Sequence, residues 1–143
     1  MNHTENYMSV GWKEWGSLPD LSIDRIHMKI DTGAKTSALH CVKHELFKKE
    51  GNDWVRFWTA IDQETETLQV CEAELVDTRK VTSSGGHATH RTVVQCELKL
   101  GGSSWPIQLT LADRSAMKFR MLLGREAMKN MAVYPHKSHI QGQ

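Results

Sequence analysis

The sequence predicts a mainly β fold, either a barrel or a sandwich, with one short helix near the C-terminus. Apolar and polar side chains alternate in several segments, which is the period of a β-strand with one buried face. Polar, glycine-bearing stretches separate some of these segments, as hairpin turns do. Helical spacing is confined to residues 125–130. Many short strands with one late helix are typical of barrels and sandwiches.

The first expected strands lie in the N-terminal half of the chain. Residues 27–31 alternate between apolar and polar side chains and end in a turn at Gly33. Residues 54–61 place Val55 and Phe57 on one face with period two. A last strand, residues 131–134, follows the short helix and closes the domain.

Two hairpins are expected between these strands. The stretch between Arg79 and Arg91 is polar and carries glycines, which is typical of an exposed hairpin tip. Gly101-Gly102 is a two-residue turn of the kind that joins antiparallel strands. The alternating segments that these turns connect are residues 68–76, 92–100 and 105–111.

The size and composition of the chain favour one soluble domain. Its 143 residues leave room for one hydrophobic core, expected at residues 12–138 between flexible tails at residues 1–11 and 139–143. No run approaches the roughly 20 apolar residues of a membrane helix, and the first residues lack the apolar core of a signal peptide, so a cytoplasmic location is expected. A net charge of +1 disfavours nucleic acid as a partner. The three widely spaced cysteines are expected to be reduced thiols.

The most informative stretch is Asp31-Thr32-Gly33-Ala34, directly after the apolar Ile30. It presents a carboxylate at a sharp turn, where Gly33 allows close backbone approach and the Thr32 hydroxyl is able to hydrogen-bond to a symmetric copy. A tripeptide of this kind occurs by chance in roughly one chain in twenty of this length. On its own, the motif also fits an aspartate that simply caps a turn.

A second motif, Leu122-Leu123-Gly124-Arg125, follows much later and leads into the expected helix. The two motifs in this order, with a glycine-bearing hairpin between them, resemble the retropepsin-like aspartic peptidases. The similarity is greatest to the bacterial family labelled ATP-dependent zinc proteases, and it covers roughly residues 12–138. The matching stretches are residues 29–40, 91–94, 109–114, Met117 and residues 121–125.

The resemblance implies a retropepsin-like closed β-barrel. It also implies that Asp31 is the catalytic carboxylate, that Thr32 and Gly33 fix it, and that Gly124 and Arg125 support the loop beneath the site. Aspartic peptidases need two carboxylates that share one proton, and the sequence contains a single Asp-Thr-Gly. A peptidase would therefore be a homodimer with one Asp31 from each subunit, and the polar hairpin tip would be the flap over a bound peptide.

Eight further positions are expected substrate contacts. Arginines and Lys35 suit acidic side chains, although a solvated surface charge is the simpler interpretation of each arginine. In many viral members the first residue after the alanine is acidic and pairs with the Gly-Arg arginine; Lys35 stands there in this chain, so Arg125 needs another partner. The candidates are Ala34, Lys35, His40, Arg79, Gly85, Gly86, Arg91 and Arg114.

Zinc and ATP are suggested by the family label alone. His40 and His44 are four residues apart, but the sequence has no His-Glu-x-x-His, no Cys-x-x-Cys and no phosphate-binding Gly-x-x-x-x-Gly-Lys loop, so no metal ligand and no cofactor are expected. For His40 the simpler interpretation is a satisfied, half-buried histidine. The resemblance assigns the ATP dependence to an ATP-grasp ligase partner, and it implies glutamate-rich or ligase-made peptides as substrates. Two alternatives stay open: a non-catalytic module that binds acidic peptides for such a ligase, and a zinc metallopeptidase.

Overall fold

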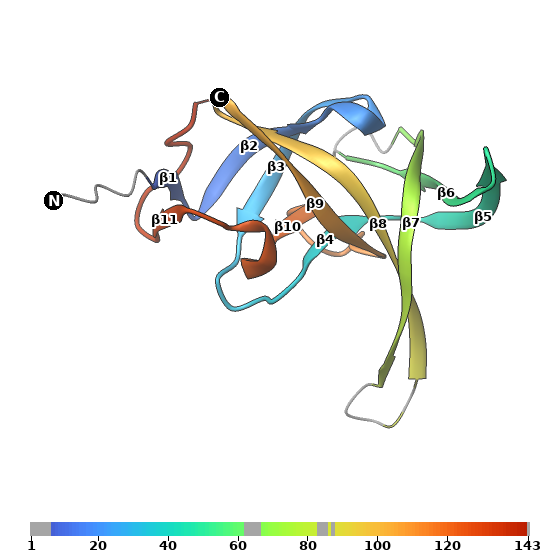
Figure 1. The fold of residues 1–143 in the computed structure, drawn as a ribbon. Coiled ribbons are helices and arrows are strands. Elements are labelled where there is room, and N and C mark those ends of the chain that lie inside the picture. Colours follow the sequence, from blue (N-terminus) through green and yellow to red (C-terminus); the bar gives the residue numbers. More distant parts are fainter. Residues whose placement is uncertain (1–6, 62–66, 83–85, 87, 143) are drawn as a thin grey trace, which may run out of the picture.

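The computed structural model describes residues 7–61, 67–82, 86 and 88–142, and nearly all of its regular structure is β-strand (Figure 1). Within these residues the two helical elements are three-residue 3-10 turns. The mainly β fold class is therefore confirmed. The elements in chain order are β1 (Met8–Gly11), β2 (Lys13–Leu18), η1 (Pro19–Leu21), β3 (Ile23–Ile30), β4 (Ser37–His40), β5 (Lys43–Lys49), β6 (Asn52–Thr59), β7 (Gln69–Thr82), β8 (Ala88–Leu100), β9 (Ser103–Ala112), β10 (Met121–Leu123), η2 (Arg125–Ala127) and β11 (Met131–Tyr134).

Six strands form a closed barrel. In the order β2-β3-β10-β4-β9-β8 each strand is hydrogen-bonded to the next, and β2 also pairs with β8 at Ser17 and Lys99, which closes the circle. Closure removes free sheet edges, so the barrel offers no strand for uncontrolled pairing. β7, β6 and β5 continue the sheet beyond β8 as an antiparallel arm, while β1 and β11 form a separate parallel pair (Figure 1).

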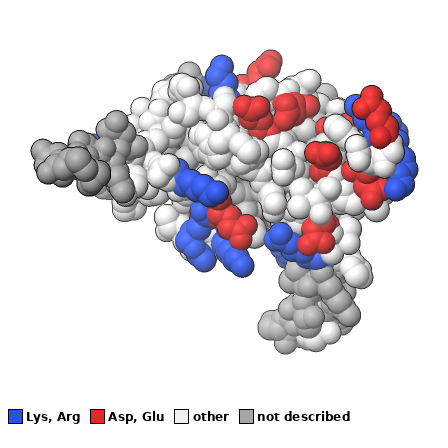
Figure 2. Space-filling model, in the orientation of Figure 1, with Lys and Arg blue, Asp and Glu red and all other residues white. Residues whose placement is uncertain are grey.

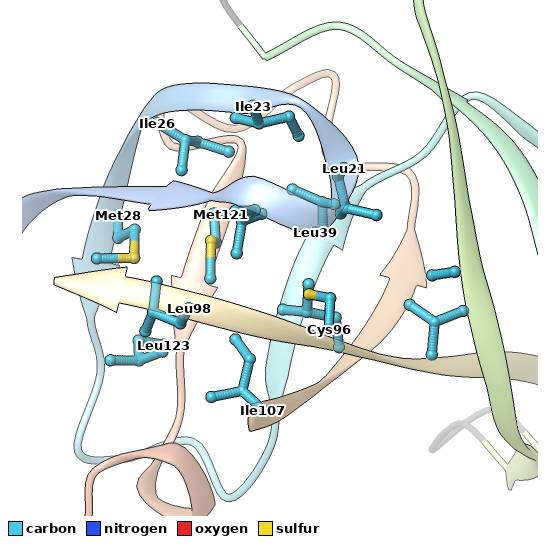
Figure 3. Close-up of a cluster of buried hydrophobic side chains, with 14 of the residues drawn as sticks. Leu21, Ile23, Ile26, Met28, Leu39, Cys96, Leu98, Ile107, Met121 and Leu123 are labelled. Atoms are coloured by element: carbon cyan, nitrogen blue, oxygen red, sulfur yellow. The ribbon is translucent and has the colours of Figure 1, made fainter. Parts of the chain in front are cut away.

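The barrel encloses the hydrophobic core. Side chains from β3, β4, β8 and β10 converge inside it, among them Met28, Leu39, Leu98 and Met121 (Figure 3). Each of these four is completely or almost completely buried. Burying a side chain of this size stabilises the fold by about 1.5–3 kcal/mol, so the core fixes the strand ends that carry the site.

The three cysteines are free and buried, as the expected reduced thiols would be. Burial raises the pKa of Cys41 and Cys71 to about 11 and that of Cys96 to about 12. Because the thiolate is the reactive form, these side chains act as small apolar core residues.

Both expected hairpins are confirmed. β7 and β8 are antiparallel, and Arg79 lies opposite Arg91 in the register. β8 and β9 are joined by Gly101-Gly102, with Leu100 opposite Ser103. The first of these glycines has a φ of 60°, the left-handed conformation that a two-residue hairpin turn requires.

The expected helix over residues 125–130 is reduced to η2. Its first backbone N–H groups do not begin a helix but donate to the loop after Asp31: Arg125 N to Ala34 O and Glu126 N to Lys35 O. At the other end, Asn130 has a φ of 58°, which interrupts helical geometry. The segment serves as a brace for that loop rather than as an independent helix.

Both expected tails contain ordered structure. Met8–Gly11 forms β1, which pairs in parallel with β11. At the other end, the backbone N–H groups of Ile140 and Gln141 donate to the buried carboxylate of Glu14, which also accepts the N–H of Gly11. One buried charge thus holds both ends of the described chain against β2, because a carboxylate without such donors would be costly to bury. In the described ranges no helix has the length and apolar character needed to cross a membrane.

Candidate active site

Asp31 begins a tight turn at the carboxyl end of β3. Its backbone N–H donates to Leu123 O in β10 (2.9 Å), and its Oδ1 accepts the N–H of Gly33 (2.9 Å). The N–H of Ala34 closes the turn on Asp31 O at 3.2 Å. Asp31 is half-buried, whereas Thr32 and Gly33 are exposed. The chain therefore presents a fixed carboxylate at its surface.

The Gly124-Arg125 motif supports this turn from beneath. β10 runs parallel to β3 and places Leu123 beside Ile30, so the two motifs lie next to each other in space. Gly124 has no room for a side chain, since a Cβ there would collide with the backbone of Thr36. Its N–H donates to the buried hydroxyl of Ser37 at 3.0 Å.

The partner of Arg125 is a backbone carbonyl. Nη1 of Arg125 donates to Thr32 O at 2.9 Å, so the guanidinium holds the turn without an acidic residue in the loop. Lys35, at the position that is acidic in many viral members, lies 3.8 Å from Glu126. The bracing function is therefore kept with a different set of contacts.

Arg114 and His40 are hydrogen-bonded to each other. Arg114 is half-buried in the loop after β9; its Nε donates to Phe119 O (3.1 Å) and its backbone N–H to His40 Nδ1 (2.9 Å). Burial lowers the pKa of Arg114, and the negative charge of Asp31 acts in the opposite direction, which makes Arg114 an electrostatic neighbour of the Asp31 carboxylate.

His40 is 1% exposed, so its ring lies inside the fold and not at the surface. Burial lowers its pKa, and the charge of Arg120 adds to this, while Asp113 opposes it. Since Nδ1 accepts a backbone N–H, the proton of the neutral ring is on Nε2. His40 thus positions the backbone of Arg114, and its burial separates it from the surface that a peptide would contact.

The β7–β8 hairpin projects well beyond the barrel (Figure 1). Arg79 and Arg91 face each other near its base, and both are accessible at the surface. Gly86 is exposed with a φ of 81°, whereas Gly85 lies outside the described residues. Arg79 makes long contacts to Asp77 Oδ2 and Gln108 Oε1, both 3.4 Å.

A cavity of about 480 Å³ lies between this hairpin base and η2. Arg79, Arg125, Lys129 and Glu126 bring charges to its walls, and Thr36 joins it to the loop after Asp31. Lys129 is a residue that the sequence interpretation missed. Lys129 lies in the turn after η2, where residue spacing does not indicate which side chains share a surface, so the sequence offered no signal for it.

The described histidines and cysteines do not fit a zinc site. His40 is buried with Nδ1 occupied by a backbone N–H, and His44 Nε2 lies 3.0 Å from the Thr92 hydroxyl. In the described part of the chain no group of three His, Cys, Asp or Glu side chains is placed to hold a metal ion. Three protein ligands are the minimum for catalytic zinc, so we derive no step through this metal.

Known proteins of two kinds are similar to the chain. The family model described as "Retropepsin-like aspartic endopeptidase RimB" matches residues 9–143. A probable alpha-L-glutamate ligase of Shewanella pealeana is 39% identical over 142 residues, which is 98% of this chain and 31% of the ligase. A probable alpha-L-glutamate ligase of Desulfotalea psychrophila is 40% identical over 125 residues, 87% of this chain and 27% of the ligase. The chain thus spans about a third of the length of these relatives.

A solved structure shares the fold. The crystal structure of Lpg0085 from Legionella pneumophila, a protein of unknown function (DUF785), superposes with a TM-score of 0.79 at 29% sequence identity. The match covers 94% of this chain and 98% of the Legionella chain. The barrel with its arm and its hairpin thus accounts for nearly all of that solved chain.

Proposed function

The chain belongs to the RimB-like family of retropepsin-like aspartic endopeptidases, and on this premise we propose that it hydrolyses peptide bonds with two copies of Asp31, one from each subunit of a homodimer. The observation that carries the proposal is the exposed Asp31-Thr32-Gly33 turn, which Arg125 braces from beneath at Thr32 O. A single described chain supplies one such turn. A second copy is needed because aspartic chemistry requires two carboxylates.

The proposed reaction uses the two carboxylates in opposite protonation states. The ionised Asp31 takes a proton from a water held between the pair, and the water oxygen attacks the carbonyl carbon of the peptide bond. The protonated Asp31 gives its proton to the carbonyl oxygen, which becomes a hydroxyl of the tetrahedral intermediate. The intermediate collapses when the C–N bond breaks: the leaving nitrogen takes a proton from the Asp31 that the water had protonated, and one hydroxyl of the intermediate returns its proton to the other Asp31. The products are a carboxyl group and an amine, and the pair is back in its starting protonation state.

We propose glutamate-rich or ligase-made peptides as the substrates. The relatives named glutamate ligases contain a region similar to this chain, which suggests that the two activities work on one product. Arg114, electrostatically close to Asp31, supplies positive charge beside the reacting bond. Lys35, Arg79 and Arg91 add further cations around the turn and the hairpin base.

A second candidate function follows from the same relatives. In it the chain is a non-catalytic module that binds acidic peptides for an ATP-grasp ligase, as one part of a larger assembly. The two functions differ in the role of Asp31. A peptidase needs the carboxylate to ionise, whereas a binding module needs only the cations and the hairpin.

The experiment that separates them combines mass and activity. Light scattering over a dilution series gives the oligomeric state, with a dimer near twice 16.3 kDa expected. Hydrolysis of oligoglutamate peptides is then followed by mass spectrometry for the native chain and for Asp31→Asn. We expect cleavage by the native dimer and none by Asp31→Asn with an unchanged fold. A strict monomer, or cleavage that survives the substitution, would contradict the shared dyad. Equal peptide binding by both chains without cleavage would favour the binding module.

A further inference from the structure

The cavity between η2 and the base of the β7–β8 hairpin has the charge of an anion site. Three cations, Arg79, Arg125 and Lys129, line it against one carboxylate, Glu126. The Glu126 carboxylate is paired with Lys35 at 3.8 Å, so its negative charge is offset by a further cation and the cavity keeps an excess of positive charge. Figure 2 shows basic side chains around η2 and at the hairpin base.

The three cations have N–H groups that are able to donate to a bound anion. Arg79 contacts Asp77 and Gln108 only at 3.4 Å, which is long for a charge-assisted hydrogen bond of about 2.7–2.9 Å. Among the described residues Arg125 uses one of its five N–H groups, on Thr32 O. Lys129 is exposed at the rim. A substrate carboxylate would therefore replace weak contacts with strong ones.

The cavity is directly connected to the catalytic turn. Thr36 and Ser37 form one wall, and Ser37 Oγ accepts the N–H of Gly124. Arg125 lines the cavity and also holds the carbonyl of Thr32, the residue next to Asp31. An extended peptide lying between the hairpin and the turn would thus reach the cavity with a side chain a short distance from the bond to be cut.

A second cleft limits how far an acidic peptide can extend. It borders the cavity at Gln95 and Pro106, and its walls carry four acidic residues against one lysine. In Figure 2 acidic side chains gather near η1 and along β7. Like charges repel across such a surface, so an acidic segment would be held at the cationic cavity and turned away from its neighbour. The acidic residues are Asp20, Glu72, Glu74 and Glu97.

We propose that this cavity is a subsite for a carboxylate side chain of the substrate, with Lys129, Arg79 and Arg125 as its cations. The inference rests on the proposed function in that it assumes a peptide at the Asp31 turn. It adds that selectivity for acidic residues arises beside the dyad as well as at Arg114, and that Lys129 is a specificity-determining residue.

The test measures binding separately from hydrolysis. A fluorescein-labelled oligoglutamate peptide is titrated with the Asp31→Asn chain, and anisotropy gives the dissociation constant. Adding Lys129→Gln or Arg79→Gln is expected to weaken binding roughly tenfold, the loss of about one charge-assisted contact, while Lys129→Arg retains it. Lys99→Gln, an exposed lysine on β8 away from the cavity, is the matched control and is expected to leave the affinity unchanged.

The outcomes separate the two claims. If oligoglutamate binds no better than oligoglutamine, or if Lys129→Gln and Arg79→Gln have no more effect than Lys99→Gln, the subsite is overturned even where the native chain cleaves peptides. If the substitutions weaken binding but the native chain cleaves none of the peptides, the subsite stands and the peptidase proposal fails. Circular dichroism of each variant establishes that the fold is kept.

Discussion

Acid is expected to destabilise the fold through His27, whose ring lies in an aromatic cluster on the outside of β3. It stacks on Trp15 with ring centres 4.2 Å apart, tilts against Phe119 at 5.0 Å, and its Nε2 lies 2.8 Å from Nε2 of His139. Two imidazole nitrogens at that distance share one proton between them. Burial, then the charges of His139, Lys13, Lys118 and Arg25, lower the pKa of His27 from 6.5 to about 4.

The sign and size of the effect follow from this shift. Above pH 6.5 the ring is neutral in both states and contributes nothing. As the pH falls from 6.5 to about 4 the unfolded chain takes up a proton that the folded chain refuses, so the free energy of unfolding decreases. A difference of this size corresponds to at most about 3 kcal/mol, and because His27 is only partly buried, solvent screening reduces the expected loss to about 1–2 kcal/mol.

The assay compares urea unfolding of the native chain and of His27→Phe, followed by tryptophan fluorescence between pH 7.5 and pH 4 at one protein concentration. Phenylalanine keeps the stacking on Trp15 but does not titrate, so the stability difference between the two chains should change by about 1–2 kcal/mol in favour of the variant on acidification. His90→Gln, at an exposed position, is the control for the loss of a histidine. Parallel pH profiles for the native chain and His27→Phe would refute the reasoning.

Two further substitutions test contacts that hold the chain ends and the Asp31 turn. Glu14→Gln should lower the free energy of unfolding by about 3 kcal/mol, because the completely buried carboxylate accepts three backbone N–H groups and an amide would turn an NH₂ toward one of them. Urea unfolding measures this loss. A loss no larger than that of the control Glu97→Gln, at an exposed position, would contradict the prediction. Gly124→Ala should lower the free energy of unfolding by about 1–3 kcal/mol, since its Cβ would push the Thr36 backbone and with it the Asp31 turn. The same shift should reduce the proposed peptide cleavage. Thermal melts and hydrolysis rates are the readouts, and native stability and activity in this variant would show that the close approach is not needed.

Many of the strands could be predicted from the sequence because their core-facing side chains are apolar. The strands of the β7–β8–β9 region alternate regularly, and the glycine pair at residues 101–102 marks its turn. The strand pattern was readable because the alternation of side chains reports which face of the sheet is buried. The resemblance to retropepsin-like peptidases, rather than a local pattern, implied that the Asp31 and Gly124-Arg125 motifs meet, and β3 and β10 do lie side by side.

The missed elements have inward positions that do not look apolar. Along β2 the buried side includes Glu14 and Gly16, a charge that is paired with backbone N–H groups and a glycine packed against Met28. β5 is exposed along nearly its whole length, so neither of its faces shows a hydrophobic period. The cationic cavity was also beyond sequence pattern, because Arg79 and Lys129 come from segments far apart in the chain and only the closed barrel brings them together.

The turn at Asp31 has many contacts with the described chain on one side and none over its exposed side. This asymmetry is relevant to the proposed dimer. Beneath the turn the support is continuous: the C-terminal segment accepts the N–H of Trp12 at Lys137 O, Trp12 O accepts the N–H of Ile30, and the next N–H, that of Asp31, donates to β10. Above the turn, Thr32 and Gly33 are exposed to solvent. Fixing the backbone costs about 1–2 kcal/mol of conformational entropy for each residue. Here the ordered residues form a turn whose outer side is not covered by any other part of the described chain. A turn held rigidly from beneath and open above is suited to meet a second rigid surface, which is the arrangement that two carboxylates sharing one proton require.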